Sequence, residues 1–234
     1  MNVLNMNFST SIVASGWLYG AYLPMALIWL WSLRTAPWRR LADSRQLNVW
    51  LGTIVSLALI WSMKADLRPG LALHLLGATA FALMFGRQLA IIGLSLVLAV
   101  VTFNSATSAY FEWQAYALNA LMTVVIPVFV AWGILRAVER WLPAHIFVYI
   151  FVATFFGAAI NVVVTGFAAT SLLGLASTYP FSWLLGEYAL PYVLLAFAEA
   201  WLTGAVITVF IVYLPDWVGS FDDRRYLLSR QGRN

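Results

Sequence analysis

Seven long apolar stretches, separated by short polar connections, dominate the hydrophobic pattern of this 234-residue chain. Each is about 17 residues long or longer, which is the length at which an α-helix crosses the hydrocarbon core of a bilayer. The predicted transmembrane helices cover residues 15–33, 47–63, 70–86, 89–107, 115–136, 146–174 and 189–214. The pattern therefore predicts an all-α, polytopic transmembrane bundle of about seven helices, rather than a barrel of shorter alternating strands.

Composition supports a membrane protein. Hydrophobic residues make up 63% of the chain and charged residues only 9%, whereas a soluble domain carries about 25% charged residues. The 12 Trp, 10 Tyr and 15 Phe fit helix ends anchored at the two lipid–water boundaries. The chain has no cysteine, which excludes disulfides, thiolate metal sites and cysteine nucleophiles.

The basic residues sort to one side of this bundle. Eleven of the 13 Lys and Arg lie in the connections on one side of the predicted bundle and in the tail, and only Lys64 and Arg68 lie on the other side. The eleven are Arg34, Arg39, Arg40, Arg45, Arg87, Arg136, Arg140, Arg224, Arg225, Arg230 and Arg233. The positive-inside rule then predicts an amino terminus outside and a cytoplasmic tail at 215–234. The net charge of +4 is therefore a topology signal and not a sign of nucleic-acid binding.

We expect a single integral membrane domain over residues 1–234, embedded from about 15 to 214 in the inner (cytoplasmic) membrane as a multi-pass protein. The start lacks the basic n-region of a signal peptide, so the first span is expected to be retained. Both Met1 and Met6 read as a start, and the sequence leaves this choice open.

Three polar side chains fall at nearly one depth close to the outer face of the predicted bundle. At a rise of about 1.5 Å per residue, His74 lies about 6 Å below the outer end of its helix, and Asn104 and Asn119 lie at similar depths on the next two helices. The amino terminus is on the same side. Asparagines often only cross-link helices, but an intramembrane imidazole near an open face commonly ligates a transition metal or relays a proton.

Glu199 lies near the middle of the last predicted helix, where it cannot face lipid cheaply. It is expected either to be protonated and hydrogen-bonded to a neighbouring helix, through Asn161 or Thr165, or to take part in gating or proton coupling. Small or polar residues recur at every fourth position on two helices, and we expect these two faces to pack together or against a partner subunit. They are Ala153, Gly157, Asn161, Thr165 and Ala169 on one helix, and Ala196, Ala200, Gly204 and Thr208 on the other.

Motifs of catalysis are absent from the sequence. It has no Walker A loop, no His-Glu-x-x-His, no Gly-x-Ser-x-Gly, and no second carboxylate beside Glu199 at helical spacing. Nucleotide hydrolysis, intramembrane proteolysis, lipid hydrolysis and di-metal chemistry therefore lack their residues. We expect a protein that is not an enzyme and that holds no permanent cofactor.

Three segments carry a family resemblance: LALHLLGATA at 71–80, ALNALM at 117–122 and AFAEAWLT at 196–203. Over about residues 65–215 the chain resembles the metal-specific substrate-binding permeases of energy-coupling-factor ABC transporters, the cobalt and nickel uptake (CbiM-like) family. The resemblance implies a seven-helix fold with the amino terminus outside. The charge pattern, which does not assume the family, predicts the same topology.

In that family the ion is held at the external side by the amino terminus, a histidine at the second position and a histidine on the third helix. His74 matches the last of these, Asn119 matches the asparagine of the Ala-Leu-Asn segment, and Glu199 matches the Ala-Glu pair of the final helix. The start differs, because Asn2 stands where the family has histidine. An asparagine amide oxygen suits a harder or more weakly bound ion.

The expected metal ligands are therefore His74, Asn119, Asn104, Met1 and Asn2, while Glu199 and Asn161 are expected to have structural or gating roles. The resemblance implies a permease that captures a divalent transition-metal ion, cobalt- or nickel-like, as its substrate. Such a chain would need a transmembrane coupling subunit and cytoplasmic ATPase subunits, because it supplies no energy source itself. Two alternatives stay open: a membrane assembly or scaffold protein, and a proton-coupled small-solute carrier that uses Glu199 and His74.

Overall fold

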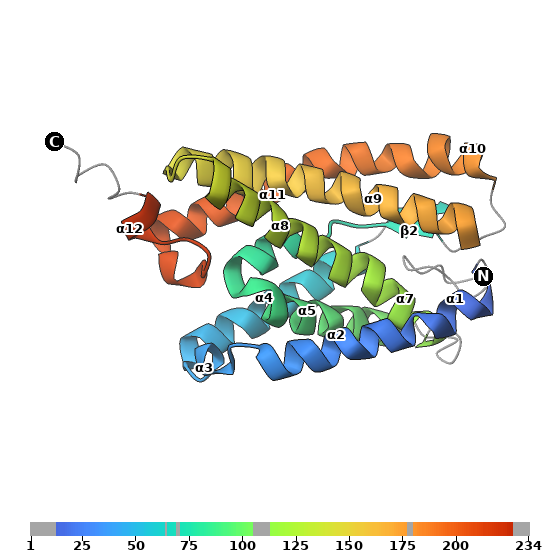
Figure 1. The fold of residues 1–234 in the computed structure, drawn as a ribbon, viewed down its shortest axis with the longest axis horizontal. Coiled ribbons are helices and arrows are strands. Elements are labelled where there is room, and N and C mark those ends of the chain that lie inside the picture. The colour runs from blue at the N-terminus through green and yellow to red at the C-terminus, as the bar shows by residue number, and fades with distance from the viewer. Residues whose placement is uncertain (1–12, 64, 69–70, 105–112, 177–179, 227–234) are drawn as a thin grey trace.

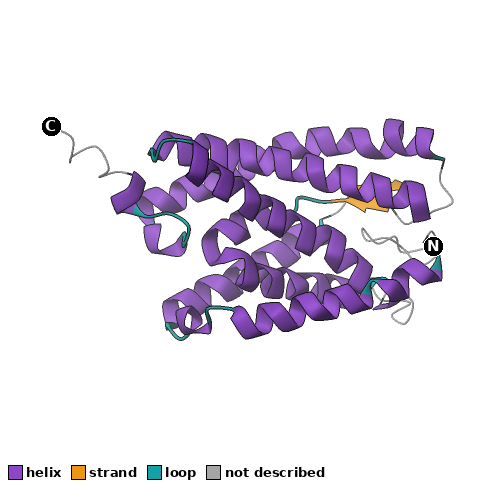
Figure 2. Ribbon diagram, viewed as in Figure 1, coloured by secondary structure: helices purple, strands orange, loops and turns teal. Residues whose placement is uncertain are grey.

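The structure is a computed structural model that describes residues 13–63, 65–68, 71–104, 113–176 and 180–226. Long helices run side by side along the longest axis of the molecule (Figure 1). In the part of the chain that is described, strands occur only in one short antiparallel hairpin, β1 (Ala65–Arg68) with β2 (Leu71–Leu73), seen in Figure 2.

The helices follow the apolar stretches of the sequence. In chain order they are α1 (Ser15–Gly20), α2 (Tyr22–Thr35), α3 (Trp38–Leu41), α4 (Ser44–Ser62), α5 (Ala78–Asn104), α7 (Tyr116–Ala120), η1 (Leu121–Val125), α8 (Ile126–Trp141), η2 (Val148–Phe156), α9 (Gly157–Ala176), α10 (Phe181–Trp183), η3 (Leu184–Ala189), α11 (Leu190–Tyr213), η4 (Pro215–Trp217) and α12 (Asp223–Tyr226).

Four continuous helical stretches among the described residues are long and apolar enough to cross a membrane: Ala78–Asn104, Tyr116–Trp141, Val148–Ala176 and Phe181–Tyr213. A helix of about 20 apolar residues spans the hydrocarbon core. The prediction of a helical membrane bundle is confirmed.

The third predicted helix, 70–86, is wrong over its first half. Strand β2 and an irregular segment, residues 74–77, come first, and helix begins only at Ala78. Gly86, with φ +78° and ψ 170°, then divides α5 into a short buried helix, 78–85, and a long one, 87–104. Glycine adopts positive φ without a Cβ clash, so the break falls where the sequence supplies that residue.

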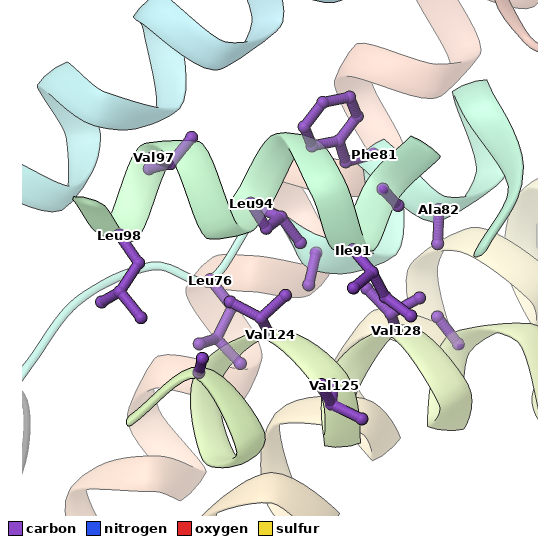
Figure 3. Packing of buried hydrophobic residues seen from close by; sticks show 14 of the residues in the cluster. Leu76, Phe81, Ala82, Ile91, Leu94, Val97, Leu98, Val124, Val125 and Val128 are labelled. Carbon is purple, nitrogen blue, oxygen red and sulfur yellow. The ribbon is translucent and has the colours of Figure 1, made fainter. Parts of the chain in front are cut away.

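Helix α5 lies at the centre of the hydrophobic core and packs against α2, α4 and α8. Figure 3 shows Ile91 of α5 beside Val128 where α5 packs on α8. Leu76, from the irregular segment, belongs to the same buried cluster as Leu94 and Val124. Burial of this apolar side chain helps to hold the segment 74–77 inside the bundle.

Helix α9 lies against α11, and two residues of its small and polar face, Gly157 and Asn161, contact other helices. Asn161 Nδ2 donates to Thr79 Oγ1 (2.8 Å) and to Pro127 O (2.9 Å), and a Cβ on Gly157 would lie 3.3 Å from Ile134. At these two positions the face is therefore turned toward α5 and α8. Asn161 is a polar cross-link among three helices.

The carboxyl-terminal segment closes the far end of the short helix 78–85. The N–H groups of Gly219 and Ser220 donate to Met84 O (2.9 Å) and Leu83 O (3.1 Å), and Arg40 Nη1 also donates to Met84 O (2.7 Å). The last carbonyls of a helix have no partner within it, so these contacts satisfy them inside the protein.

Candidate functional site

His74 lies in the irregular segment between β2 and α5 and is buried, with 5% of its surface exposed. Its Nδ1–H donates to the carbonyl oxygen of Leu75 at 2.7 Å. The imidazole ring packs against the indole of Trp61, with the ring centroids 4.2 Å apart. His74 is thus not on a helix, which invalidates the depth estimated from helical rise.

Glu199, on α11, binds the backbone directly after His74. Its Oε2 accepts from the Leu76 N–H at 2.8 Å, and its Oε1 accepts from the Gly77 N–H at 2.6 Å. The residue is only 1% exposed. The expected partners Asn161 and Thr165 are therefore not its hydrogen-bond donors. The N–H groups that lead into the first turn of α5 need acceptors, and a carboxylate is favourable at the amino terminus of a helix.

Trp61 holds the same segment from α4. Its Nε1–H donates to the carbonyl oxygen of Leu76 at 3.0 Å. The carbonyl of Gly77 in turn accepts from the Phe81 N–H at 3.0 Å, which begins α5. The backbone after His74 is therefore held by hydrogen bonds from three elements of the fold.

Gly77 makes this path of the chain sterically possible. Its φ is +63°, and a Cβ added there would lie 2.3 Å from Leu57 Cδ2 on α4. The backbone conformation thus favours glycine, and any larger residue would also have to displace the Leu57 side chain. The sequence signal for this turn was a glycine just ahead of a helical run, but the apolar residues around it concealed it.

The other four expected ligands do not share one environment. Asn119 lies on α7 and is 3% exposed, so it is buried like His74. Asn104 is the last residue of α5 and is exposed. Met1 and Asn2 lie outside the described residues. The structure therefore buries two of the five expected ligands and exposes one.

Within the described ranges, no three His, Cys, Asp or Glu side chains come together as a metal-binding group. A metal site at His74 would thus combine one imidazole with amide or backbone donors, or with residues outside those ranges. Trp61 and the peptide groups of Leu76 and Gly77 were not identified from the sequence. A tryptophan near a helix end has the same sequence signal as an interfacial anchor.

A cavity of about 550 Å³ lies between α4 and α11 and reaches Gly77. Its lining includes Leu57, Met84 and Phe210 together with small polar residues, and has no charged or imidazole side chain. Its chemistry is therefore unsuited to binding a metal ion, which prefers imidazole or charged oxygen ligands.

Comparison with solved structures places this fold beside one described as a truncated transition metal transporter. The TM-score is 0.74 at 16% sequence identity, and the match covers 89% of this chain and 99% of the other. At this identity the likeness shows the fold. None of the curated proteins compared with the chain matches it.

A family model, CbiM, described as the cobalt uptake substrate-specific transmembrane region, matches residues 7–217. The match includes the His74 segment, Asn119 and Glu199, which carried the resemblance seen in the sequence, and that resemblance is confirmed. It assigns the chain to transport rather than to enzyme catalysis, as the missing catalytic motifs predict. Because the match extends over most of the chain, this protein belongs to the CbiM family.

Proposed function

We propose that this protein is the substrate-capturing component of an importer for a divalent transition-metal ion, and that His74 binds the ion through Nε2. The observation that carries the proposal is the 2.7 Å contact between His74 Nδ1 and Leu75 O. A carbonyl oxygen only accepts, so Nδ1 carries the proton and the lone pair is on Nε2. Metal-binding histidines characteristically donate their other N–H to a carbonyl or carboxylate.

The remaining ligands are proposed to be Asn119, Asn104, Met1 and Asn2. Burial of Asn119 supports its part in this set, because a buried amide oxygen is shielded from competing water. One imidazole with amide oxygens is a harder ligand set than two imidazoles. The proposed ion is cobalt- or nickel-like, and it is the transported substrate rather than a resident cofactor.

Transport by this chain is proposed to depend on a separate transmembrane coupling subunit and on cytoplasmic ATPase subunits of the energy-coupling-factor type, in the inner membrane. The sequence supports this because it contains no nucleotide-binding loop of its own. Copurification of the native complex from membranes, followed by a metal-dependent ATPase assay, tests the assembly.

Titration calorimetry of the purified protein against Co²⁺, Ni²⁺, Mn²⁺ and Zn²⁺ tests the binding site. His74→Ala is expected to abolish or severely weaken binding, and acidification should weaken binding to the unaltered protein because a protonated imidazole cannot ligate a metal. His145→Ala is the matched control, since His145 is the chain's other histidine and its Nδ1 accepts from the Phe147 N–H at 3.2 Å. Normal binding by the His74→Ala protein would disprove the proposal.

The alternatives make different predictions for the same proteins. A scaffold protein would show no metal-dependent heat, and His74→Ala would change only thermal stability. A proton-coupled carrier would transport in liposomes without any ATPase.

A further inference from the structure

One peptide group connects Glu199 with His74. The carbonyl of Leu75 accepts from His74 Nδ1–H at 2.7 Å, and the N–H of Leu76, which belongs to the same peptide unit, donates to Glu199 Oε2 at 2.8 Å. Hydrogen bonds in series polarise one another. The carboxylate of Glu199 therefore increases the electron density on the Leu75 carbonyl oxygen, which accepts the hydrogen bond from His74.

The next peptide group is held just as firmly. The Leu76 carbonyl accepts from Trp61 Nε1–H at 3.0 Å, and the Gly77 N–H donates to Glu199 Oε1 at 2.6 Å. Rotation of either peptide plane would break a hydrogen bond to a buried carboxylate, which is among the stronger kinds. The carbonyl that orients His74 is thus fixed from α4 and α11 together.

We propose that Glu199 is a positioning residue of the metal site. Acting through the Leu75–Leu76 peptide, it fixes the orientation and tautomer of His74 and raises the basicity of Nε2 without touching the ion. The inference rests on the proposed function, because it concerns the imidazole assigned there as a ligand. It extends that function by linking a ligand on the irregular segment 74–77 to helix α11.

A purely structural role for Glu199 makes a different prediction. If the carboxylate only satisfied the amino-terminal end of α5, its loss would lower stability and leave the ligand geometry of a bound ion unchanged. A positioning role changes the coordination of the ion as well as its affinity. Spectroscopy of the bound metal therefore separates the two roles.

The test substitution is Glu199→Gln, which keeps the size of the side chain but replaces one acceptor oxygen by an NH₂ group facing a backbone N–H. With Co²⁺ alone as the probe, affinity is expected to fall about 10- to 100-fold, the range seen when partners of metal-ligating histidines are removed. The visible absorption of Co²⁺ and its X-ray absorption should show altered imidazole ligation. Glu199→Asp, which keeps the charge, should recover part of the affinity.

Tyr149→Phe is the matched control. Tyr149 is fully buried and pairs with Ser220 Oγ at 2.6 Å, and Ser220 contacts the opposite end of the same short helix 78–85. This variant should lose thermal stability and keep the Co²⁺ affinity and spectrum of the unaltered protein. An unchanged spectrum and affinity in Glu199→Gln, or equal changes in Tyr149→Phe, would overturn the inference.

Trp61→Phe decides the question if Glu199→Gln does not fold. It keeps an aromatic ring beside His74 but removes the donor to Leu76 O. The Co²⁺ spectrum and affinity are expected to change in the same direction as in Glu199→Gln, but less. An unchanged spectrum and affinity would count against the inference. His74→Ala separates the two levels of the proposal. Normal binding by His74→Ala defeats the proposed function, whereas lost binding there with an unaffected Glu199→Gln defeats only the positioning role.

Discussion

Glu199 and His74 contact opposite sides of one peptide group, the carboxylate through its N–H and the imidazole through its carbonyl. Both hydrogen bonds are to the Leu75–Leu76 backbone, so the peptide group connects the two side chains. A buried acid near the middle of an apolar helix is thereby explained by the backbone it holds, since two N–H donors compensate its transfer from water.

Gly77→Ala is expected to destabilise the protein by about 1 to 3 kcal/mol, the range for a residue forced into a sparsely populated backbone conformation. The φ of +63° disfavours a Cβ, and the Leu57 side chain occupies the space that it would need. Thermal unfolding in detergent measures the loss. Gly133→Ala on α8, where nothing lies within 4 Å of an added Cβ, should not lower stability, and equal losses in both would contradict the reason given.

Asn161→Leu should lower stability by about 1 kcal/mol, because hydrogen bonds between transmembrane helices average about 0.6 and reach about 1.7 kcal/mol. The substitution removes the bonds to Thr79 Oγ1 and Pro127 O. Metal affinity should be unchanged if Asn161 is structural. A folded Asn161→Leu protein that binds metal normally but fails to transport within its complex would instead indicate gating.

Ser220 and Tyr149 should behave as a coupled pair. Ser220 Oγ–H donates to Leu83 O at 2.7 Å, so the Tyr149 hydroxyl donates to Ser220 Oγ at 2.6 Å. We expect Ser220→Ala and Tyr149→Phe each to lower the free energy of unfolding by about 1 kcal/mol. The double variant should lose less than the sum of the two, and strict additivity in the double-mutant cycle would show that the bonds are independent.

Topology can be tested by single-cysteine labelling, because the chain contains no cysteine. The positive-inside rule puts Phe181 outside and Leu142 in the cytoplasm, and both side chains are exposed, at 54% and 41%. A membrane-impermeant maleimide should label Phe181→Cys in intact cells and Leu142→Cys only after lysis. The reverse pattern would show that the charge-based orientation is wrong.

The site could be predicted only in part. His74, Asn119 and Glu199 were recognisable because polar side chains are rare in apolar stretches and expensive there. The structure buries all three but exposes Asn104 at the end of α5. The depth estimate assumed an unbroken helix, and the turn at Gly77 removes that assumption for His74.

Apolar length alone was enough to predict a helical membrane bundle, because every backbone polar group in hydrocarbon must be satisfied within a helix or a closed sheet. Hydropathy measures side-chain polarity and not backbone conformation, so the irregular segment 74–77, which lies within an apolar stretch, could not be distinguished from a helix. The chain leaves helix there because Glu199 and Trp61, distant in sequence, accept and donate the hydrogen bonds that a helix would otherwise make. Only the packing of α4 and α11 around the segment brings those partners within reach.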